Sequence, residues 1–176
     1  MQEIDFRRDI LPLKDQLYRV ALRIVADRAE AEDLVQETLI RVWNKRDTWQ
    51  QLESVEAYCL TVVRNLSIDH AEQANRQLAE LPPDYECAEE SADPCDRLVS
   101  KEQLRLVHEL MRQLPEQQRT IMQLRDVEGK SYREISSIMS LTEEQVKVYL
   151  FRARQKVKQK FLEIDRYGLQ EHGTSA

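Results

Sequence analysis

Apolar residues recur at three- and four-residue intervals along most of this chain, the spacing of amphipathic α-helices with one buried face. The N-terminal half holds two such series, over residues 17–25 and 34–43. A third series covers Val55–Arg76, after a polar loop at Lys45–Glu53. The pattern predicts a helical bundle over residues 1–78.

Two residues of this bundle are predicted to be core side chains. Trp43 occupies an apolar position in the second series, so its ring is expected to be buried. Cys59 stands in an apolar helical run, where an unpaired cysteine behaves as a small hydrophobic residue.

The helical periodicity stops between residues 79 and 97. This segment contains Pro82, Pro83 and Pro94 among many acids, a composition that predicts a flexible acidic linker. Cys87 and Cys95 also lie there. The chain has no CxxC pair and an odd number of cysteines, so the spacing favours neither a disulfide framework nor a zinc site.

A second helical module is predicted over residues 98–165, followed by a disordered tail at 166–176. Its first helix carries apolar residues between Leu104 and Leu114. Pro115 suits the first turn of the next helix, and Gly129 suits a helix C-cap.

The end of this module has the pattern of a helix-turn-helix. Ser131 with Glu134 fits a capping box, and Thr142 with Gln145 repeats that signature eleven residues later. The segment Lys147–Lys160 then carries six basic residues and no acid. This is the pattern of a recognition helix that enters a DNA major groove. On this pattern alone an ordinary solvated helix pair fits equally well.

Composition supports an all-α protein of two small domains. The 176 residues are 41% hydrophobic and include only three glycines and five prolines, few for a β-rich fold. The net charge is −6, but the charge is segregated. Glu80–Asp96 carries seven acids and no base, whereas Glu116–Phe161 carries ten bases against six acids. A basic C-terminal module is consistent with a nucleic-acid partner.

The sequence offers no pattern of an enzyme, a cofactor site or a metal site. The three histidines are isolated in sequence, and a Gly-rich phosphate loop is absent. The sequence shows no signal peptide and no apolar run long enough to span a membrane, so a cytoplasmic protein is expected.

Three sequence blocks together resemble the extracytoplasmic-function (ECF) class of bacterial RNA polymerase sigma factors, in the sigma-70 family. They are AEDLVQETLIRVW (Ala31–Trp43), EAYCLTVVRNLSID (Glu56–Asp69), and LPEQQRTIMQLRDVEGKSYREISSIMS with VKVYLFRARQKVK (Leu114–Ser140 and Val146–Lys158). The helix-turn-helix block is shared with many regulators, but its combination with the first two is highly specific. The resemblance implies a promoter-specificity subunit with a sigma-2-like domain, a linker and a sigma-4-like domain.

The resemblance also implies partners and site residues. The partners are core RNA polymerase, through its β′ clamp helices and β flap, promoter DNA, and an anti-sigma factor. The implied polymerase-binding residues, on the first block, are Asp33, Gln36, Glu37 and Arg41. The implied −10 DNA-binding residues are Arg64, Asn65, Asp69 and Arg76, with Asn65 the best candidate for a pocket that holds an unstacked base. Trp43 and Trp49 are open candidates for base stacking. The implied −35 DNA-binding residues are Lys147, Val148, Tyr149, Phe151, Arg152, Arg154 and Lys156.

The chain departs from the family pattern at two places. His70, Ala71, Glu72 and Gln73 follow Asp69 where basic residues are common, so phosphate contacts there are expected to be weak or differently placed. Glu143, Glu144 and Gln145 replace a small, Thr-rich corner at the start of the recognition helix. We hypothesise that this corner gives an unusual −35 preference.

Two other classes of function stay open on the sequence alone. One is an autonomous helix-turn-helix regulator that binds duplex DNA without polymerase, and the other is a helical protein-binding adaptor. Intramolecular masking of the basic surface by the acidic linker is a further possibility.

Overall fold

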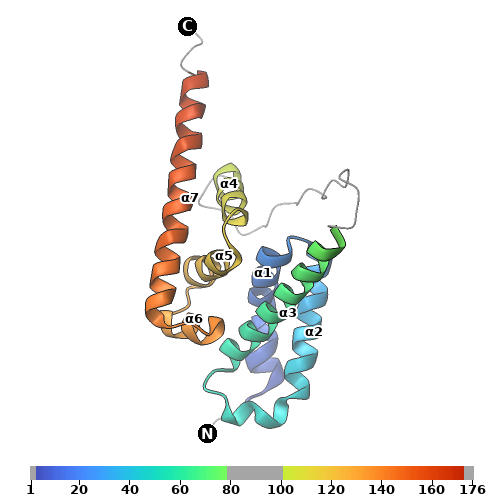
Figure 1. The fold of residues 1–176 in the computed structure, drawn as a ribbon. Coiled ribbons are helices and arrows are strands. Elements are labelled where there is room, and N and C mark those ends of the chain that lie inside the picture. The colour runs from blue at the N-terminus through green and yellow to red at the C-terminus, as the bar shows by residue number, and fades with distance from the viewer. Residues whose placement is uncertain (1–2, 79–100, 173–176) are drawn as a thin grey trace.

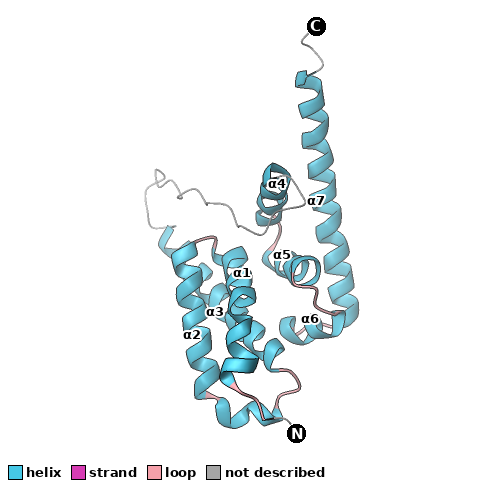
Figure 2. Cartoon of the chain, turned by 180° about the vertical axis from the view of Figure 1, so that it is seen from behind, coloured by secondary structure: helices cyan, strands magenta, loops and turns pink. Residues whose placement is uncertain are grey.

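The computed structural model describes residues 3–78 and 101–172, and within these ranges every regular element is a helix (Figures 1 and 2). This confirms the predicted all-α fold. The predicted acidic linker, with Cys87 and Cys95, lies outside the described residues.

The N-terminal domain is a three-helix bundle with short helical turns before and within it. Its elements are η1 (Phe6–Ile10), η2 (Leu11–Leu13), α1 (Lys14–Val25), α2 (Arg28–Asn44), η3 (Arg46–Gln51) and α3 (Val55–Leu78). Helix α1 packs against both α2 and α3, which also contact each other. Leu17, Val35 and Leu60 are among the side chains buried where the helices meet. Cys59 is fully buried, as its apolar surroundings predicted.

The C-terminal domain consists of α4 (Lys101–Arg112), α5 (Glu116–Met122), η4 (Gln123–Val127), α6 (Tyr132–Met139) and α7 (Glu143–His172). Helix α7 has 30 residues, so it is about 45 Å long. It packs against α4, α5 and α6 along its first half and then projects beyond them (Figure 1). Leu110, Met111 and Leu114 pack with Ala153 and Val157, which fastens α4 to α7.

Local capping explains where the helix-turn-helix bends. Ser131 Oγ accepts a hydrogen bond from the Glu134 amide at 3.1 Å, and the Glu134 carboxylate accepts one from the Ser131 amide at 2.8 Å. The Thr142–Gln145 pair makes the same reciprocal bonds at 3.1 and 3.0 Å. Between them Ser140 adopts a left-handed conformation, with φ of 54°, which ends α6. Both predicted capping boxes are confirmed.

Two predictions were wrong. Trp43 is 44% exposed, whereas Trp49 is the buried ring, with Nε1 donating to the Val42 carbonyl at 3.0 Å. Trp43 lies in the last turn of α2, where the chain turns into η3 and leaves part of its ring in solvent. The second concerns part of the predicted disordered tail, because α7 continues to His172; residues 173–176 lie outside the described residues.

The two domains pack directly on each other. Helix α6 lies against α3, and α5 and η4 lie against α1 (Figures 1 and 2). One continuous apolar core includes Leu17 and Val63 of the first domain and Ile121 and Ile135 of the second.

Candidate polymerase and nucleic-acid interfaces

The outward face of α2 carries the four residues that the sequence assigned to polymerase binding. Asp33, Gln36, Glu37 and Arg41 are all exposed, while Leu34, Val35 and Val42 are buried on the opposite face. Arg41 Nη2 donates to Glu37 Oε1 at 2.6 Å, one helical turn away. An exposed i,i+4 pair of this kind adds little stability, so both groups are available to a partner.

Sequence reasoning missed an apolar residue on this face. Ile40 is 60% exposed and lies one turn after Gln36 and Glu37. Because the buried centre of a protein interface is more apolar than its rim, Ile40 is a candidate contact beside these polar groups. Its position in the helical series could have revealed it, because it falls outside the apolar stripe of α2.

A pocket of about 410 Å³ opens between the C-terminal end of α2 and the middle of α3. Asn65 and Asp69, one turn apart on α3, are exposed and line it. The full lining is Arg41, Asn44, Lys45, Tyr58, Val62, Asn65, Leu66 and Asp69. The pocket thus combines an aromatic ring, two amides, a carboxylate and two cationic groups, which suits a flat polar ring such as a nucleic-acid base.

The structure separates the other two predicted −10 residues from this pocket. Arg64 is partly buried, and its Nη2 donates to Glu116 Oε2 of α5 at 3.3 Å. Its Nη1 lies 3.5 Å from Asn65 Oδ1. Arg76 is exposed near the end of α3, three turns beyond Asn65. Asn65 and Asp69 therefore form one group with the α2 residues, and Arg64 belongs to the contact between the domains.

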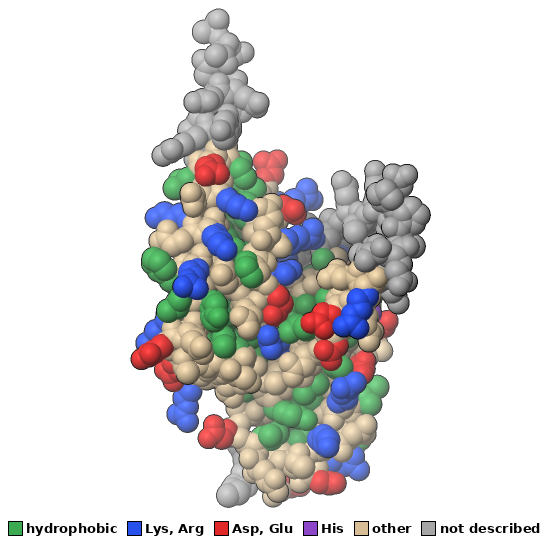
Figure 3. Space-filling view, in the orientation of Figure 1, with side chains coloured by type: hydrophobic (Ala, Val, Ile, Leu, Met, Phe, Trp, Pro, Cys, Tyr) green, Lys and Arg blue, Asp and Glu red, His purple; other side chains and the backbone are tan. Residues whose placement is uncertain are grey.

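Helix α7 presents most of its predicted DNA-facing residues to solvent. Val146, Leu150 and Ala153 face the domain core, and the opposite side carries Val148 and Phe151. Six of the seven predicted residues are exposed, and Tyr149 is half-buried. The exposed ones are Lys147, Val148, Phe151, Arg152, Arg154 and Lys156. Figure 3 shows apolar and basic side chains interspersed over α7.

Arg154 differs from its basic neighbours because its charge is already paired. Its guanidinium donates to both oxygens of Asp126, with Nε 3.1 Å from Oδ2. This carboxylate raises the pKa of Arg154 above its ordinary value. The pair ties α7 to η4, which makes Arg154 a weaker candidate for DNA contact than Arg152.

The polar residues at the start of α7 differ in what they contact. Gln145 is used by the capping box with Thr142. Glu143 and Glu144 are exposed in the first turn, where negative charge is favourable to the helix dipole.

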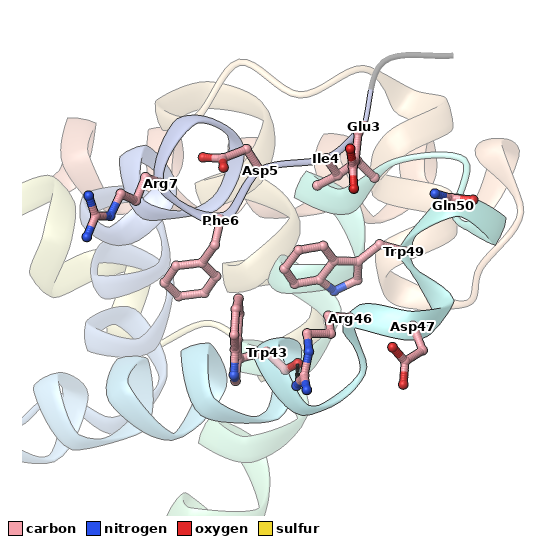
Figure 4. A pocket seen from close by; sticks show the side chains of 10 residues that line it. All are labelled: Glu3, Ile4, Asp5, Phe6, Arg7, Trp43, Arg46, Asp47, Trp49 and Gln50. Atoms are coloured by element: carbon pink, nitrogen blue, oxygen red, sulfur yellow. Dashed lines mark hydrogen bonds between the residues drawn. The ribbon is translucent and has the colours of Figure 1, made fainter.

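A second hollow lies where η1, α2 and η3 meet (Figure 4). The rings of Phe6, Trp43 and Trp49 turn toward one another there, with Phe6 and Trp43 edge to face at 5.4 Å between centroids. The Arg46 guanidinium lies 4.9 Å from the centre of the Trp43 ring. Since Trp49 is buried, Trp43 alone of the two tryptophans offers a ring that a base could stack on.

Ion pairs between described residues cross the boundary between the domains. Arg19 pairs with Glu128, Glu56 with Lys130, and Arg64 with Glu116. Arg119 of α5 also donates to the Arg23 carbonyl of α1 at 3.2 Å. Burial lowers the pKa of Arg119 and of Lys130 from their ordinary values. These partners fix the register of the two domains in this arrangement.

A metal site and a membrane-spanning helix each require features that the described residues do not provide. No group of three or more His, Cys, Asp or Glu side chains is placed to hold a metal ion in the part of the chain that is described. None of the helices in residues 3–78 and 101–172 combines the length and apolar character that crossing a bilayer requires.

Fold and sites together define a two-domain helical protein in which a three-helix bundle precedes a helix-turn-helix domain. Comparison with sequence families gives the same division. The family described as Sigma-70 region 2 matches residues 10–77, and the family described as Sigma-70, region 4 matches residues 104–157.

Individual relatives are consistent with these matches. The chain is 27% identical to the RNA polymerase sigma-H factor of Pseudomonas aeruginosa, over 85% of this chain and 83% of that protein. It is 30% identical to the ECF RNA polymerase sigma factor SigL of Mycobacterium tuberculosis, with 74% of each chain covered. Some relatives are longer, and the chain spans 40% and 56% of two of them.

Among solved structures, the fold is similar to the sigma factor RpoE of Bartonella quintana, crystallised with the anti-sigma factor NepR. The TM-score is 0.74 at 24% identity, covering 92% of this chain and 98% of that one. The chain belongs to the ECF RNA polymerase sigma factors, the promoter-specificity subunits of that enzyme.

Proposed function

We propose that this sigma factor binds core RNA polymerase through the exposed face of α2, reads a −10 element at the α2–α3 pocket, and reads a −35 element with α7. The observation that carries the proposal is the pocket lined by Asn65 and Asp69, which opens beside the α2 face. A base captured there would lie next to the polymerase, where strand separation is needed.

The proposed polymerase contact is the stripe of Asp33, Gln36, Glu37 and Arg41 around Ile40. Its polar groups are exposed and the Arg41–Glu37 ion pair lies within one turn of the same helix, so a partner displaces little to reach them. Ile40 supplies the apolar contact that an entirely charged face would lack. Its proposed partner is the pair of clamp helices of the β′ subunit, while the β flap contacts the C-terminal domain.

The proposed −10 contact is the capture of one unstacked base. Unstacking costs a few kcal/mol, which a pocket and a basic rim offset. Asn65 offers both a donor and an acceptor to a base edge, Tyr58 offers a ring, and Arg41 and Lys45 offer cations to the flanking phosphates. Arg76 is placed further along α3 for a phosphate of the adjoining DNA.

The proposed −35 contact uses the exposed part of α7. Lys147, Arg152 and Lys156 are exposed cations for phosphates or guanine edges. Tyr149 is half-buried, so less of its side chain is available to DNA.

The remaining proposals concern partners and place of action. An anti-sigma factor is proposed as the regulator, as the B. quintana relative was crystallised with one. The protein is proposed to have no catalytic activity of its own and to act in the cytoplasm, where polymerase and promoter DNA are found.

Reconstituted transcription tests the proposal. Core polymerase with this protein should initiate from a cognate promoter, and Asn65→Ala should abolish or strongly reduce open-complex formation. Asn75→Ala is the matched control, because Asn75 is exposed on the same helix outside the pocket.

The same assay decides the second candidate function. A protein that binds a specific duplex tightly without polymerase, and supports no initiation with it, would instead be an autonomous regulator.

A further inference from the structure

Two large apolar side chains stand in the middle of the exposed face of α7. Val148 is 47% exposed and Phe151 is 63% exposed, whereas Val146, Leu150 and Ala153 are at most 2% exposed on the opposite face. The two exposed residues are three positions apart, so they lie side by side on one helix face. Within the described residues nothing covers them.

Cations flank this apolar pair on both sides. Lys147 and Arg152 are exposed and adjoin Val148 and Phe151 in sequence, and Lys156 follows one turn later. The Lys147 ammonium lies 5.3 Å from the Tyr132 ring of α6, which holds it near the start of the recognition helix. This surface therefore has an apolar centre surrounded by cations. It is complementary to a partner whose negative charges surround an apolar group.

The major groove offers one such apolar group. Each base edge there presents hydrogen-bond donors or acceptors, and the only methyl group is the C5 methyl of thymine. An apolar side chain that enters the groove therefore gains most from thymine. Polar edges under Val148 or Phe151 would lose water without a replacement hydrogen bond.

We propose that Val148 and Phe151 are specificity-determining residues that read thymine methyl groups in the −35 element. Phe151, the more exposed and larger of the two, contacts the methyl of one thymine, and Val148 contacts a neighbouring one on either strand. Lys147 and Arg152 hold the flanking phosphates or guanine edges. This assignment rests on the proposed function of α7 as the −35 reader.

The size of the effect follows from the area of one methyl group. Burying a methylene-sized group contributes about 0.8 kcal/mol, which corresponds to roughly a fourfold change in affinity for each methyl removed. Loss of the Phe151 ring removes that contact entirely, so Phe151→Ala should abolish the dependence on the methyl that it reads.

The experiment uses the protein with core polymerase and proceeds in two steps. A promoter library randomised in the −35 region is first selected by binding, and the preferred sequence should contain thymines. Each thymine is then replaced singly by deoxyuridine, which removes only the methyl group. Wild-type holoenzyme should lose about fourfold in affinity at the positions that are read. Phe151→Ala and Val148→Ala should each lose the sensitivity at one position.

Ile164→Ala is the matched control. Ile164 is also an exposed apolar residue of α7, at 44%, but it lies thirteen residues beyond Phe151, about 20 Å along the helix. This variant should keep the full deoxyuridine sensitivity of the wild type. All three side chains are exposed, so the truncations spare the core.

The outcomes separate the two levels of the proposal. If the holoenzyme selects no sequence in the −35 region, both the proposed function of α7 and the thymine assignment are wrong. If it selects a −35 element that is insensitive to deoxyuridine, the function stands and the thymine assignment is overturned. Sensitivity that persists unchanged in both alanine variants overturns it as well.

Discussion

The Arg19 guanidinium of α1 donates two hydrogen bonds, of 2.7 and 2.8 Å, to the carboxylate of Glu128, which lies 109 residues further along the chain. The Glu128 side chain is only 3% exposed, and its Oε1 also accepts a bond from Gln123 Nε2 at 3.2 Å. The pair therefore joins the two domains at a point that is almost closed to water. Removing the Arg19 cation would leave the Glu128 carboxylate buried without a charged partner. The resulting loss in stability is larger than the net stability that the ion pair itself contributes.

When the two domains pack on each other as in this structure, α3 and α7 lie too close together to reach the −10 and −35 elements at the same time. The −10 and −35 elements are about 25 base pairs apart, or roughly 85 Å at 3.4 Å per base pair. Helix α6 touches both α3 and α7. Because packed helix axes lie about 10 Å apart, α7 approaches α3 to roughly 20 Å. We therefore expect the domains to separate when both elements are bound.

Arg19→Glu should open the docked arrangement. The substitution places two carboxylates together, and the loss of charged hydrogen bonds is worth roughly 2 kcal/mol or more. Small-angle scattering should give a larger radius of gyration. The double variant Arg19→Glu with Glu128→Arg should restore compactness. Arg8→Glu, which disrupts the exposed Arg8–Asp9 pair, should leave the radius unchanged. An Arg19→Glu protein as compact as wild type would show that the pair does not hold the domains.

Glu116→Gln should release Arg64. Arg64 is paired with Glu116 across the domain boundary, and a neutral amide holds a guanidinium less strongly. The freed cation should raise affinity for a single-stranded −10 oligonucleotide and steepen its salt dependence by up to about one unit. Fluorescence anisotropy at several salt concentrations measures both quantities. Glu109→Gln removes an equal charge from the exposed pair with Arg112 and should change neither.

Arg152→Ala and Arg154→Ala should differ in their salt dependence on promoter DNA. If Arg152 neutralises a phosphate, its loss reduces the slope of log affinity against log salt by about one. If it reads a base, discrimination falls by about 1–3 kcal/mol at one position instead. Arg154 is held by Asp126, so Arg154→Ala should leave the slope nearly unchanged and lower thermal stability slightly. Equal slopes for both variants would contradict this assignment.

Glu144→Ala should change base preference at one position of the −35 element. Glu144 is exposed in the first turn of α7, and a carboxylate in the groove repels phosphates unless it accepts from a cytosine amino group. A binding selection with each protein compares the preferences. Identical selected sequences would refute an unusual preference caused by this corner.

Cys59 should make the free energy of unfolding fall at alkaline pH. Burial raises the pKa of this thiol from 9.0 to about 12, because the thiolate is poorly solvated in the core. The neutral thiol is thus favoured by folding, and its contribution is complete below pH 9. As the pH rises from 9 toward 12 the unfolded state loses the proton first, so stability falls by about 1.4 kcal/mol per pH unit.

Denaturant unfolding at pH 7 and pH 10.5 measures this effect for the wild type and Cys59→Ala. The alanine variant should lack the part of the alkaline loss that belongs to the thiol. Peptide mapping after alkylation should also find Cys59 unmodified in the native protein and modified after unfolding. Rapid native alkylation at Cys59 would contradict its burial.

Much of the local structure could be predicted from sequence because it depends on neighbours in the chain. The helices follow from three- and four-residue spacing, and the capping boxes at Ser131 and Thr142 require only a partner three residues later. Cys59 could be assigned to the core because it stands in an apolar helical run, where an unpaired cysteine behaves as a small hydrophobic residue.

The exposure of Trp43 and of Ile40 was not predicted from helical spacing. Periodicity shows which residues share a helix face, but it does not show how far along the helix another element covers that face. Trp43 lies beyond the covered length of α2, and Ile40 lies outside its buried stripe, so both are exposed. The helical residues past 165 were missed because nothing in their spacing marks a packed face.

The sequence by itself determined the helices, their caps, the division into two domains and the residues of the recognition helix, since all of these rest on short-range patterns. Only the tertiary structure decided that Arg64 faces Glu116 instead of the pocket of Asn65, that Arg154 is paired with Asp126, and that Arg19 reaches Glu128. Each of these pairs joins residues 28 to 109 positions apart. Such contacts depend on how whole helices pack, and the spacing of residues along one helix carries no information about them.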